Sequence, residues 1–181
     1  MTISASLLAH IRGAACQRGA FQLPTRQIID EYFDEYLLAS DPVLLHEVAA
    51  EMAHCVPVET ETLVGLELGG IPFVVALSAA TGIPAGFLRR ERRSHGTCRQ
   101  LEGHPVAGKR AVVVDDVVRS GSQVLRAASV LRRAGASVTT AVCVLDRYLD
   151  GRARLAENQI VLRFLLTPAA LGTQSPVRQT S

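Results

Sequence analysis

The sequence predicts an α/β domain built on a mostly parallel β-sheet that is flanked by helices. Short apolar runs typical of buried strands alternate, from residue 61 onward, with stretches whose apolar residues recur at helical spacing. Such alternation requires right-handed crossovers, which place helices on both faces of the sheet. Polar turns follow several of the strands, and ligands of parallel sheets bind at the carboxyl ends of the strands.

The first part of the chain is expected to form a helix and a small N-terminal hood. Residues 4–18 are expected to be helical. Residues 21–38 hold four of the eight Phe and Tyr residues of the chain, and they predict a short hairpin or an irregular hood. Asp41 and Pro42 begin a second helix that runs to about His54, since an aspartate N-cap and a proline in the first turn favour helix initiation.

The remaining elements follow in order as strand and helix. Strands are expected at 62–66, 84–88, 111–114, 138–145 and 160–166, and helices at 71–80, 124–134 and 151–157. The polar stretch 172–181 is expected to be a frayed tail. We expect one domain over residues 1–181, with a hood region at 1–40 and the core of the domain at 60–166.

The stretch AVVVDDVVRSGSQVLR, residues 111–126, is central to the prediction. Its apolar start predicts a strand buried on both faces, which ends at Asp115 and Asp116. A small polar turn, 119–122, then leads into a helix. The turn offers backbone N–H groups and the positive end of a helix dipole to an anion. The two carboxylates can accept hydrogen bonds from sugar hydroxyls, so the stretch indicates a site for a ribose 5-phosphate.

Three other interpretations of this stretch stay open. An apolar strand ending in Asp-Asp also occurs in response-regulator receivers, but there it opens the domain, whereas more than half of this chain precedes it. A nucleotide hydrolase would need a phosphate loop. The one candidate, GHPVAGK at 103–109, is followed by Arg110 and leads into a strand. The third interpretation is an ordinary strand, loop and helix whose acids are solvated.

Composition and charge narrow the classes of protein. A hydrophobic content of 48% suits a globular domain, and a net charge of +2 gives no indication of nucleic acid or membrane as a partner. The four cysteines lack C-x-x-C spacing and predict free thiols in a reducing cytoplasm. Residues 68–88 form a charge-free run long enough to raise the question of a membrane span, but glycines and prolines interrupt it. We therefore expect a soluble, cytoplasmic protein.

Two more segments with arginines follow predicted strands. Residues 89–100, RRERRSHGTCRQ, have no apolar periodicity, and a solvated loop is the simplest interpretation. Their five arginines and His95 would equally suit a mobile lid over a polyphosphate. Arg147 comes after the strand 138–145, where it could form a surface ion pair with Asp146 or Asp150, or bind a ligand. All these segments should meet at one edge of the sheet.

These residues together resemble a known family. VVVDDVVRSGS is similar to the phosphoribosyl diphosphate (PRPP) fingerprint of type I phosphoribosyltransferases. The longer segment from GIPAGFLRRERRSHG to VCVLDR, residues 82–147, resembles orotate phosphoribosyltransferases more narrowly. The resemblance covers about 63–147, and more weakly FQLP and YFDEYLLASDP in the hood.

The resemblance implies a fold, an activity and partners. The fold would be type I phosphoribosyltransferase-like, with the small hood beside a PRPP-binding core at 60–166. The activity would transfer the 5-phosphoribosyl group from PRPP to orotate, giving orotidine 5′-phosphate and diphosphate in pyrimidine biosynthesis. Mg²⁺ would be held mainly by PRPP, without side-chain ligands. The partners would be PRPP, orotate and a second copy of the chain, whose loop 89–100 would close over the neighbouring site.

The resemblance also implies a role for each site residue. Asp115 and Asp116 would hold the ribose hydroxyls, and Arg93 and His95 would join them in catalysis. Arg147, with Arg119 beside it, would meet the carboxylate of orotate. The residues implied to bind PRPP are Arg89, Arg90, Arg93, His95, Asp115, Asp116, Val117, Val118, Arg119, Ser120, Gly121, Ser122 and Gln123.

The chain departs from the family pattern at several positions. Family members usually carry lysine where this chain has Arg90 and Arg93, often lysine at Gly69, and most commonly threonine at Arg119. In the hood, PTR at 24–26 replaces the usual lysine or serine and the Ser-Gly after it. Arginine can still clamp a diphosphate in bidentate fashion. Two alternatives stay open: a phosphoribosyltransferase for another base, and a non-catalytic regulator that binds PRPP.

Overall fold

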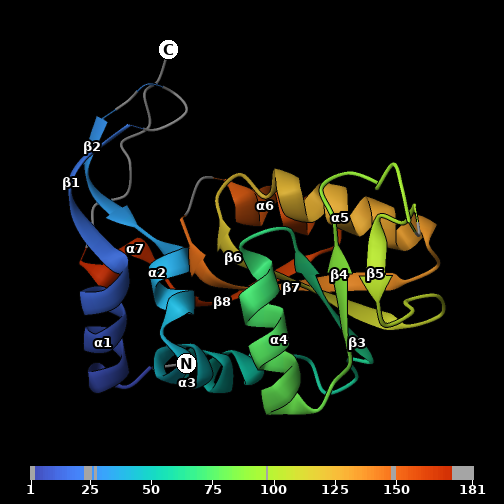
Figure 1. The fold of residues 1–181 in the computed structure, drawn as a ribbon, viewed down its shortest axis with the longest axis horizontal. Helices are drawn as coiled ribbons and strands as arrows, with labels where there is room; N and C mark the ends of the chain where they lie inside the picture. Colours follow the sequence, from blue (N-terminus) through green and yellow to red (C-terminus); the bar gives the residue numbers. More distant parts are fainter. Residues whose placement is uncertain (1–2, 23–25, 27, 97, 148–149, 173–181) are drawn as a thin grey trace.

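The computed structural model describes residues 3–22, 26, 28–96, 98–147 and 150–172. Within these ranges there are two sheets, the hairpin β1–β2 and a sheet of six strands in the order β5-β4-β3-β6-β7-β8 (Figure 1). The strands of the larger sheet pair in parallel, except that β5 runs antiparallel to β4. The predicted mostly parallel sheet is thus confirmed. The strands of this sheet are β3 (Thr62–Leu66), β4 (Ala85–Leu88), β5 (Leu101–Gly103), β6 (Arg110–Val118), β7 (Ser137–Asp146) and β8 (Val161–Leu166).

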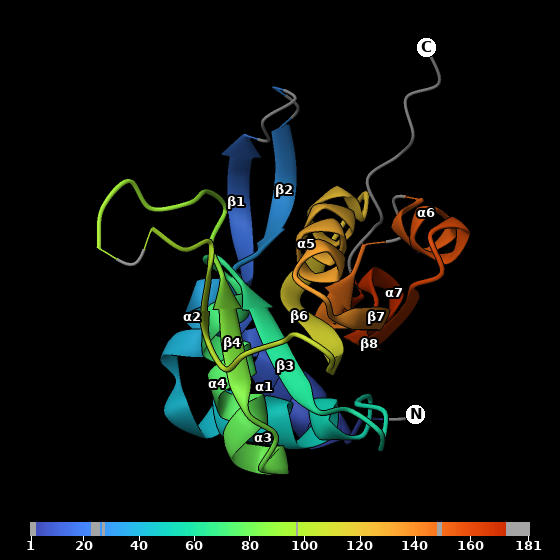
Figure 2. The same ribbon diagram turned by 90° about the vertical axis from the view of Figure 1, so that its right-hand side faces the viewer.

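The central strand β6 divides the apolar residues of the protein into two cores. Val112 and Val114 pack in the core that contains α3 (Pro42–Ala53) and α4 (Gly70–Thr81). Val113, which points to the opposite face, packs in the core that contains α5 (Ser122–Arg133). Figure 2 shows α5 on one side of the sheet and α3 and α4 on the other. Alternate residues of one strand therefore bury both faces, as expected for a central parallel strand.

The N-terminal region differs from its prediction. The first helix, α1 (Ala5–Ala15), ends three residues earlier than expected, and Cys16 begins strand β1 (Cys16–Gln22). The prediction of a helix to residue 18 was wrong because β2 (Ile28–Phe33) pairs with these residues; Phe33 lies opposite Cys16. The predicted hairpin is present, but it starts at Cys16 instead of Phe21. Pairing between segments distant in sequence outweighs local helix propensity here.

A short helix after the hairpin was not predicted. Asp34 caps α2 (Glu35–Ser40), because its Oδ1 accepts hydrogen bonds from the backbone N–H groups of Tyr36 and Leu37, both at 3.0 Å. The expected cap at Asp41 is confirmed, since it accepts from Val43 N at 2.9 Å and begins α3. These two caps turn the chain twice within eight residues and bring the start of α2 to the edge of the sheet.

The predicted strand at 111–114 was too short. Strand β6 continues to Val118, because Asp115 and Val117 pair with Cys143 and Leu145 of β7. The acidic pair therefore lies within a strand and not in the turn after it. Strand β5 and helix α7 (Pro168–Leu171) were also missed, while α6 (Gly151–Glu157) has its predicted bounds.

Other predictions have a simple outcome. The charge-free run 68–88 is divided between α4 and β4, and no helix in the described part of the chain is long and apolar enough to cross a membrane. All four cysteines are free thiols, as predicted. Of the predicted tail, residues 173–181 lie outside the described residues.

Candidate active site

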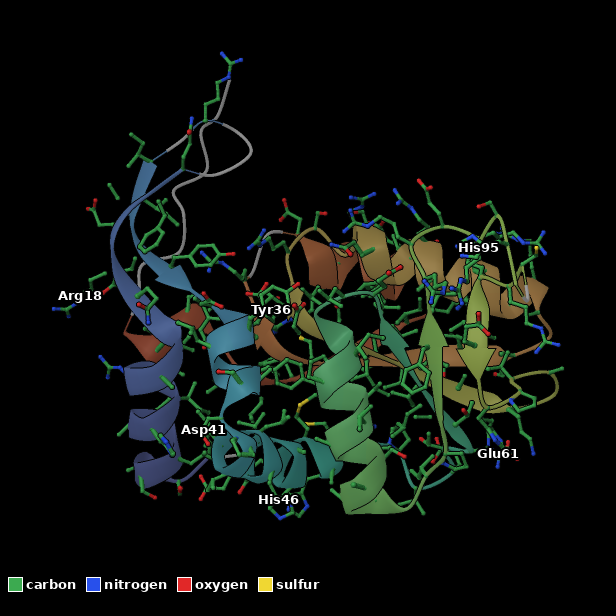
Figure 3. The ribbon with its side chains drawn as sticks, viewed as in Figure 1. Arg18, Tyr36, Asp41, His46, Glu61 and His95 are labelled. Carbon is green, nitrogen blue, oxygen red and sulfur yellow. The ribbon has the colours of Figure 1, made fainter. Side chains whose placement is uncertain are left out.

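A cavity of about 180 Å³ opens at the carboxyl ends of β3 and β6. Its walls come from the turn after β3, the end of β6, the first turn of α5 and the start of α2. Figure 3 shows Tyr36 at the upper end of α2, on the same upper edge of the molecule as His95. The residues that line the cavity are Glu35, Tyr36, Glu67, Leu68, Gly69, Arg90, Asp115, Asp116, Val117, Val118, Arg119, Ser120, Gly121, Ser122, Gln123 and Val124.

The acidic pair is held rigidly at this edge. The Oδ1 atom of Asp115 accepts a hydrogen bond from Asp116 N at 3.1 Å, and Asp116 Oδ1 accepts one from Val117 N at 2.6 Å. Asp115 is only 6% exposed. Burial, and next the neighbouring charge of Asp116, raise the pKa of Asp115 well above its usual range. The two carboxyl groups are thus rigidly placed hydrogen-bond acceptors. Their negative charges lie close together, which is unfavourable in the absence of a ligand.

A glycine makes room for the acidic pair. A Cβ atom at Gly69 would overlap the carboxylate of Asp116. Glycine at this position lets the turn after β3 lie against β6 without moving the Asp116 side chain. The family pattern often has lysine here, and in this chain a side chain at residue 69 would displace the Asp116 carboxylate.

The turn between β6 and α5 offers backbone donors to an anion. Gly121 has φ = 71° and precedes the first residue of the 12-residue helix α5. No side chain caps this helix, and its first turn holds no acidic residue. The hydroxyls of Ser120 and Ser122 lie 3.0 Å apart at the same point. Uncapped N–H groups, two hydroxyls and the positive end of the helix dipole together favour a phosphate.

Helix α6 supports this turn from behind. A Cβ atom at Gly151 would overlap the carbonyl oxygen of Arg119, so only glycine allows the helix to lie this close. The buried carboxylate of Asp146, at the end of β7, accepts a hydrogen bond from Arg152 Nε of α6 at 2.7 Å and forms an ion pair with Arg152 Nη2 at 2.6 Å. The guanidinium of Arg152 also lies over the ring of Phe164, 4.3 Å from its centre. The end of β7, α6 and the phosphate turn are thus joined.

We expect Arg152→Ala to lower the free energy of unfolding by about 2 to 3 kcal/mol, because it removes a charged partner of a fully buried carboxylate. The effect should lie below that of a completely buried pair, since the Arg152 side chain is 44% exposed. Chemical denaturation measures it. Arg133→Ala is the matched control and should change stability by less than about 0.5 kcal/mol, because the side chain of Arg133 is exposed and bonds the hydroxyl of Ser129 on its own helix. Equal stability of both variants would contradict the prediction.

Arg147 lies half-buried beside this turn, and its backbone N–H donates a hydrogen bond to Val118 O at 2.9 Å. Burial, and then the neighbouring guanidinium of Arg119, lower the pKa of Arg147. It forms no salt bridge with any carboxylate in the described part of the chain. A half-buried guanidinium that has a second positive charge nearby and no carboxylate partner among the described residues favours an anionic ligand.

The loop 89–100 places its arginines at different distances from the cavity. Arg90 lines the cavity, and its N–H bonds Glu67 Oε2 at 2.9 Å. Arg93 and His95 are exposed and line a wide outer hollow with Glu67 and Leu68. Arg89 lies in an adjacent cavity, between β4 and α5. The structure therefore joins Arg90 to residues 115–123 in one cavity, while Arg89, Arg93, His95 and Arg147 stand outside its lining.

Among the lining residues that were absent from the predicted site, Glu35 and Tyr36 come from a helix that was itself not predicted. Both belong to the first turn of α2. The sequence Asp34-Glu35-Tyr36-Leu37-Leu38 has an N-cap residue followed by helix formers, a signal that could have predicted the helix. It could not have shown that the helix starts against the acidic pair.

Known proteins share both the sequence and this arrangement. The phosphoribosyl transferase domain family matches residues 47–167. The match includes the acidic pair of β6 and the start of α5. An orotate phosphoribosyltransferase of Nocardioides sp. is 42% identical over 94% of this chain and 96% of its own length. The chain belongs to the phosphoribosyltransferase family and, within it, to the orotate phosphoribosyltransferases.

Solved structures agree with this assignment. The orotate phosphoribosyltransferase of Mycobacterium tuberculosis, in complex with Fe(III) dicitrate, superimposes with a TM-score of 0.84 at 26% identity. The match covers 93% of this chain and 98% of that one. The enzyme from Aeropyrum pernix is 32% identical, with a TM-score of 0.78 over 93% of this chain and 96% of its own.

Proposed function

We propose that this protein transfers the 5-phosphoribosyl group of PRPP to orotate, producing orotidine 5′-phosphate and diphosphate. The observation that carries the proposal is the single cavity in which the acidic pair lies beside the uncapped start of α5. The family and its named relatives support the same reaction. An enzyme of pyrimidine biosynthesis would act in the cytoplasm.

The cavity suits PRPP in one orientation. The 5-phosphate would bind at residues 119–123, which line the cavity and supply backbone N–H groups and the hydroxyls of Ser120 and Ser122. The ribose hydroxyls would donate to Asp115 and Asp116. The diphosphate would then lie toward Arg90, at the start of the loop 89–100.

The reaction is a displacement at the anomeric carbon of the ribose. As the bond to diphosphate breaks, positive charge develops on the ribose ring. The carboxylates of Asp115 and Asp116 stand on that side and stabilise the charge in a site partly removed from water. Arg93 and His95 would reach the diphosphate when the loop closes, and closure would exclude water that would otherwise hydrolyse PRPP.

Magnesium would enter with the substrate. Over residues 3–22, 26, 28–96, 98–147 and 150–172, no group of three or more His, Cys, Asp or Glu could hold a metal ion. Mg²⁺ keeps several waters and is commonly bound through substrate phosphates and few carboxylates. A cavity lined by carboxylates fits an ion that PRPP itself holds. The ion would neutralise the diphosphate leaving group.

The decisive experiment measures diphosphate release from PRPP with and without orotate. Release that depends on orotate, with orotidine 5′-phosphate as product, is the expected result. Release with another base but not with orotate would favour a different phosphoribosyltransferase. Binding of PRPP without release in the presence of any base would favour the non-catalytic regulator.

We expect Arg147→Ala to raise the orotate KM by about 10- to 100-fold, since one charged hydrogen bond contributes about 1.5–3 kcal/mol. The PRPP affinity should change little. The preference for orotate over uracil, which lacks the carboxylate, should narrow. Steady-state kinetics with both bases and calorimetric titration of PRPP measure these effects, with Arg133→Ala as the control. An unchanged orotate KM would exclude Arg147 as the carboxylate-binding residue.

A further inference from the structure

Glu35 is an acid in the cavity to which neither the fold nor the fingerprint gives a role. It is the first residue of α2 and lines the cavity together with Asp116 and the phosphate turn. Its Oε2 atom is buried and has no hydrogen-bond partner among the described residues. A buried carboxylate oxygen without a partner is costly, so it indicates a group that a ligand completes.

Charged and titratable groups from three other parts of the chain surround Glu35. Burial is the main cause that raises the pKa of Glu35, and Asp116 of β6 and Asp34 raise it further. A hydrogen bond with the backbone of Glu35 itself, and after it the charge of Arg119 on the phosphate turn, oppose this change and lower the pKa. Glu35 also acts electrostatically on Tyr36 beside it, on Asp115 of β6 and on Arg147 after β7.

Glu35 lines the same cavity as Asp115, Asp116 and Arg119. Under the proposed function, Asp115 and Asp116 bind the ribose and Arg147 binds the carboxylate of orotate. In orotate the carboxylate stands on the carbon next to the ring N–H that bonds to the ribose. Since Glu35 lines the cavity together with Asp116 and Arg119, its carboxyl can face this N–H when orotate lies beside the ribose.

We propose that Glu35 is the general base that accepts the proton of the reacting ring nitrogen of the base. This inference rests on the proposed function. The bond between ring nitrogen and anomeric carbon forms as the bond from that carbon to the diphosphate oxygen breaks. The diphosphate leaves with the electron pair, and the proton of the ring nitrogen passes to the carboxylate of Glu35. The neutral acid then loses the proton to water when the product leaves.

The environment of Glu35 suits this role. A general base acts best when its pKa lies closer to neutral than that of an ordinary carboxylate, and burial shifts Glu35 in that direction. Its ionised form is the active one, so the rate should rise with pH through the raised pKa. The positive charge of Arg119 favours the ionised form of Glu35, so Arg119 would help to keep the base active.

The test is Glu35→Gln, which keeps the size and helix position of the side chain but cannot accept the proton. We expect kcat with orotate to fall by about 10²- to 10⁴-fold, with little change in PRPP affinity. The pKa of Asp115 in this site is also raised. In a plot of log kcat against pH, the slope of the acidic limb should therefore decrease by one proton in the variant. The limb that remains should report the titration of Asp115. Glu47→Gln, an exposed residue of α3 that faces His10 at 3.8 Å, is the matched control and should behave as wild type.

A second base separates proton transfer from a purely structural role. In 5-fluoroorotate the ring N–H is more acidic, so it depends less on a general base, and the defect of Glu35→Gln should be smaller with it than with orotate. An equal defect with both bases, or an acidic limb that shifts without a change of slope, would overturn the proposal. Wild-type turnover of orotate is measured first: its absence contradicts the proposed function itself, whereas wild-type behaviour of Glu35→Gln contradicts the role of Glu35 alone.

Discussion

Asp116→Asn is expected to lower kcat/KM for PRPP by about 10- to 100-fold, the effect of losing one charged hydrogen bond of about 1.5–3 kcal/mol. The fold should survive, because asparagine keeps the Oδ1 that accepts from Val117 N. What changes is the charge that faces the ribose. Steady-state kinetics with saturating orotate measure the effect, and far-ultraviolet circular dichroism checks the fold. Asp30→Asn, an exposed aspartate of β2, is the control. Normal kcat/KM in a folded Asp116→Asn variant would remove this carboxylate from the ribose site.

The same variant should be more stable than wild type in the absence of PRPP. The folded-state pKa of Asp115 is raised, by burial first and by Asp116 next. An acid whose folded pKa lies above its unfolded value gives stability that is present at low pH and is lost as pH rises through the folded pKa. Removing the charge of Asp116 lowers that pKa, so less stability is lost. The gain in Tm of Asp116→Asn over wild type should therefore grow as pH rises from about 4 to 7. A gain that shrinks with pH would contradict this account of the pair.

The main sheet could be predicted from sequence because its signals are local. Four apolar residues before Asp115 predicted a strand buried on both faces, and Val112, Val113 and Val114 do alternate between the two cores. The small polar turn at 119–122 before a helical stretch predicted backbone donors for an anion. The order of strands along the chain then placed the carboxylates and the turn on one edge. Short elements were not predicted: the three residues of strand β5, for example, are too few to show a periodicity.

The hood could not be predicted in the same way. From sequence alone, residues 16–18 read as a continuation of the helix before them. They form a strand because they pair with β2. Glu35 enters the cavity because Asp34 and Asp41 both cap helices and turn the chain back toward β6. This position depends on tertiary contacts, and the fingerprint in β6 contains no information about it. The roles of Arg93 and His95 likewise stay a prediction, since both are exposed on the loop 89–100.

Mixing Arg93→Ala chains with Asp116→Asn chains is expected to restore activity that neither variant has alone. We propose a homodimer in which the loop of one subunit closes over the site of the other. Figure 2 shows this loop extending away from the body of the subunit beyond the end of β4. One site of each mixed dimer would then combine an intact Asp116 with an intact Arg93 from the partner. Random assembly makes half of the dimers mixed, so about a quarter of wild-type activity should return.

The design of this experiment separates action across the interface from action within one subunit. The two variants are refolded together, mixed dimers are shown by two different affinity tags, and diphosphate release is measured. A second mixture combines wild-type chains with chains carrying both substitutions. If the loop acts on the neighbouring site, both sites of each such mixed dimer are damaged, and about a quarter of the activity remains. If the loop serves its own subunit, the wild-type half of each mixed dimer stays active, so about half remains. The first mixture would then recover nothing, which would contradict the proposed closure over the neighbouring site.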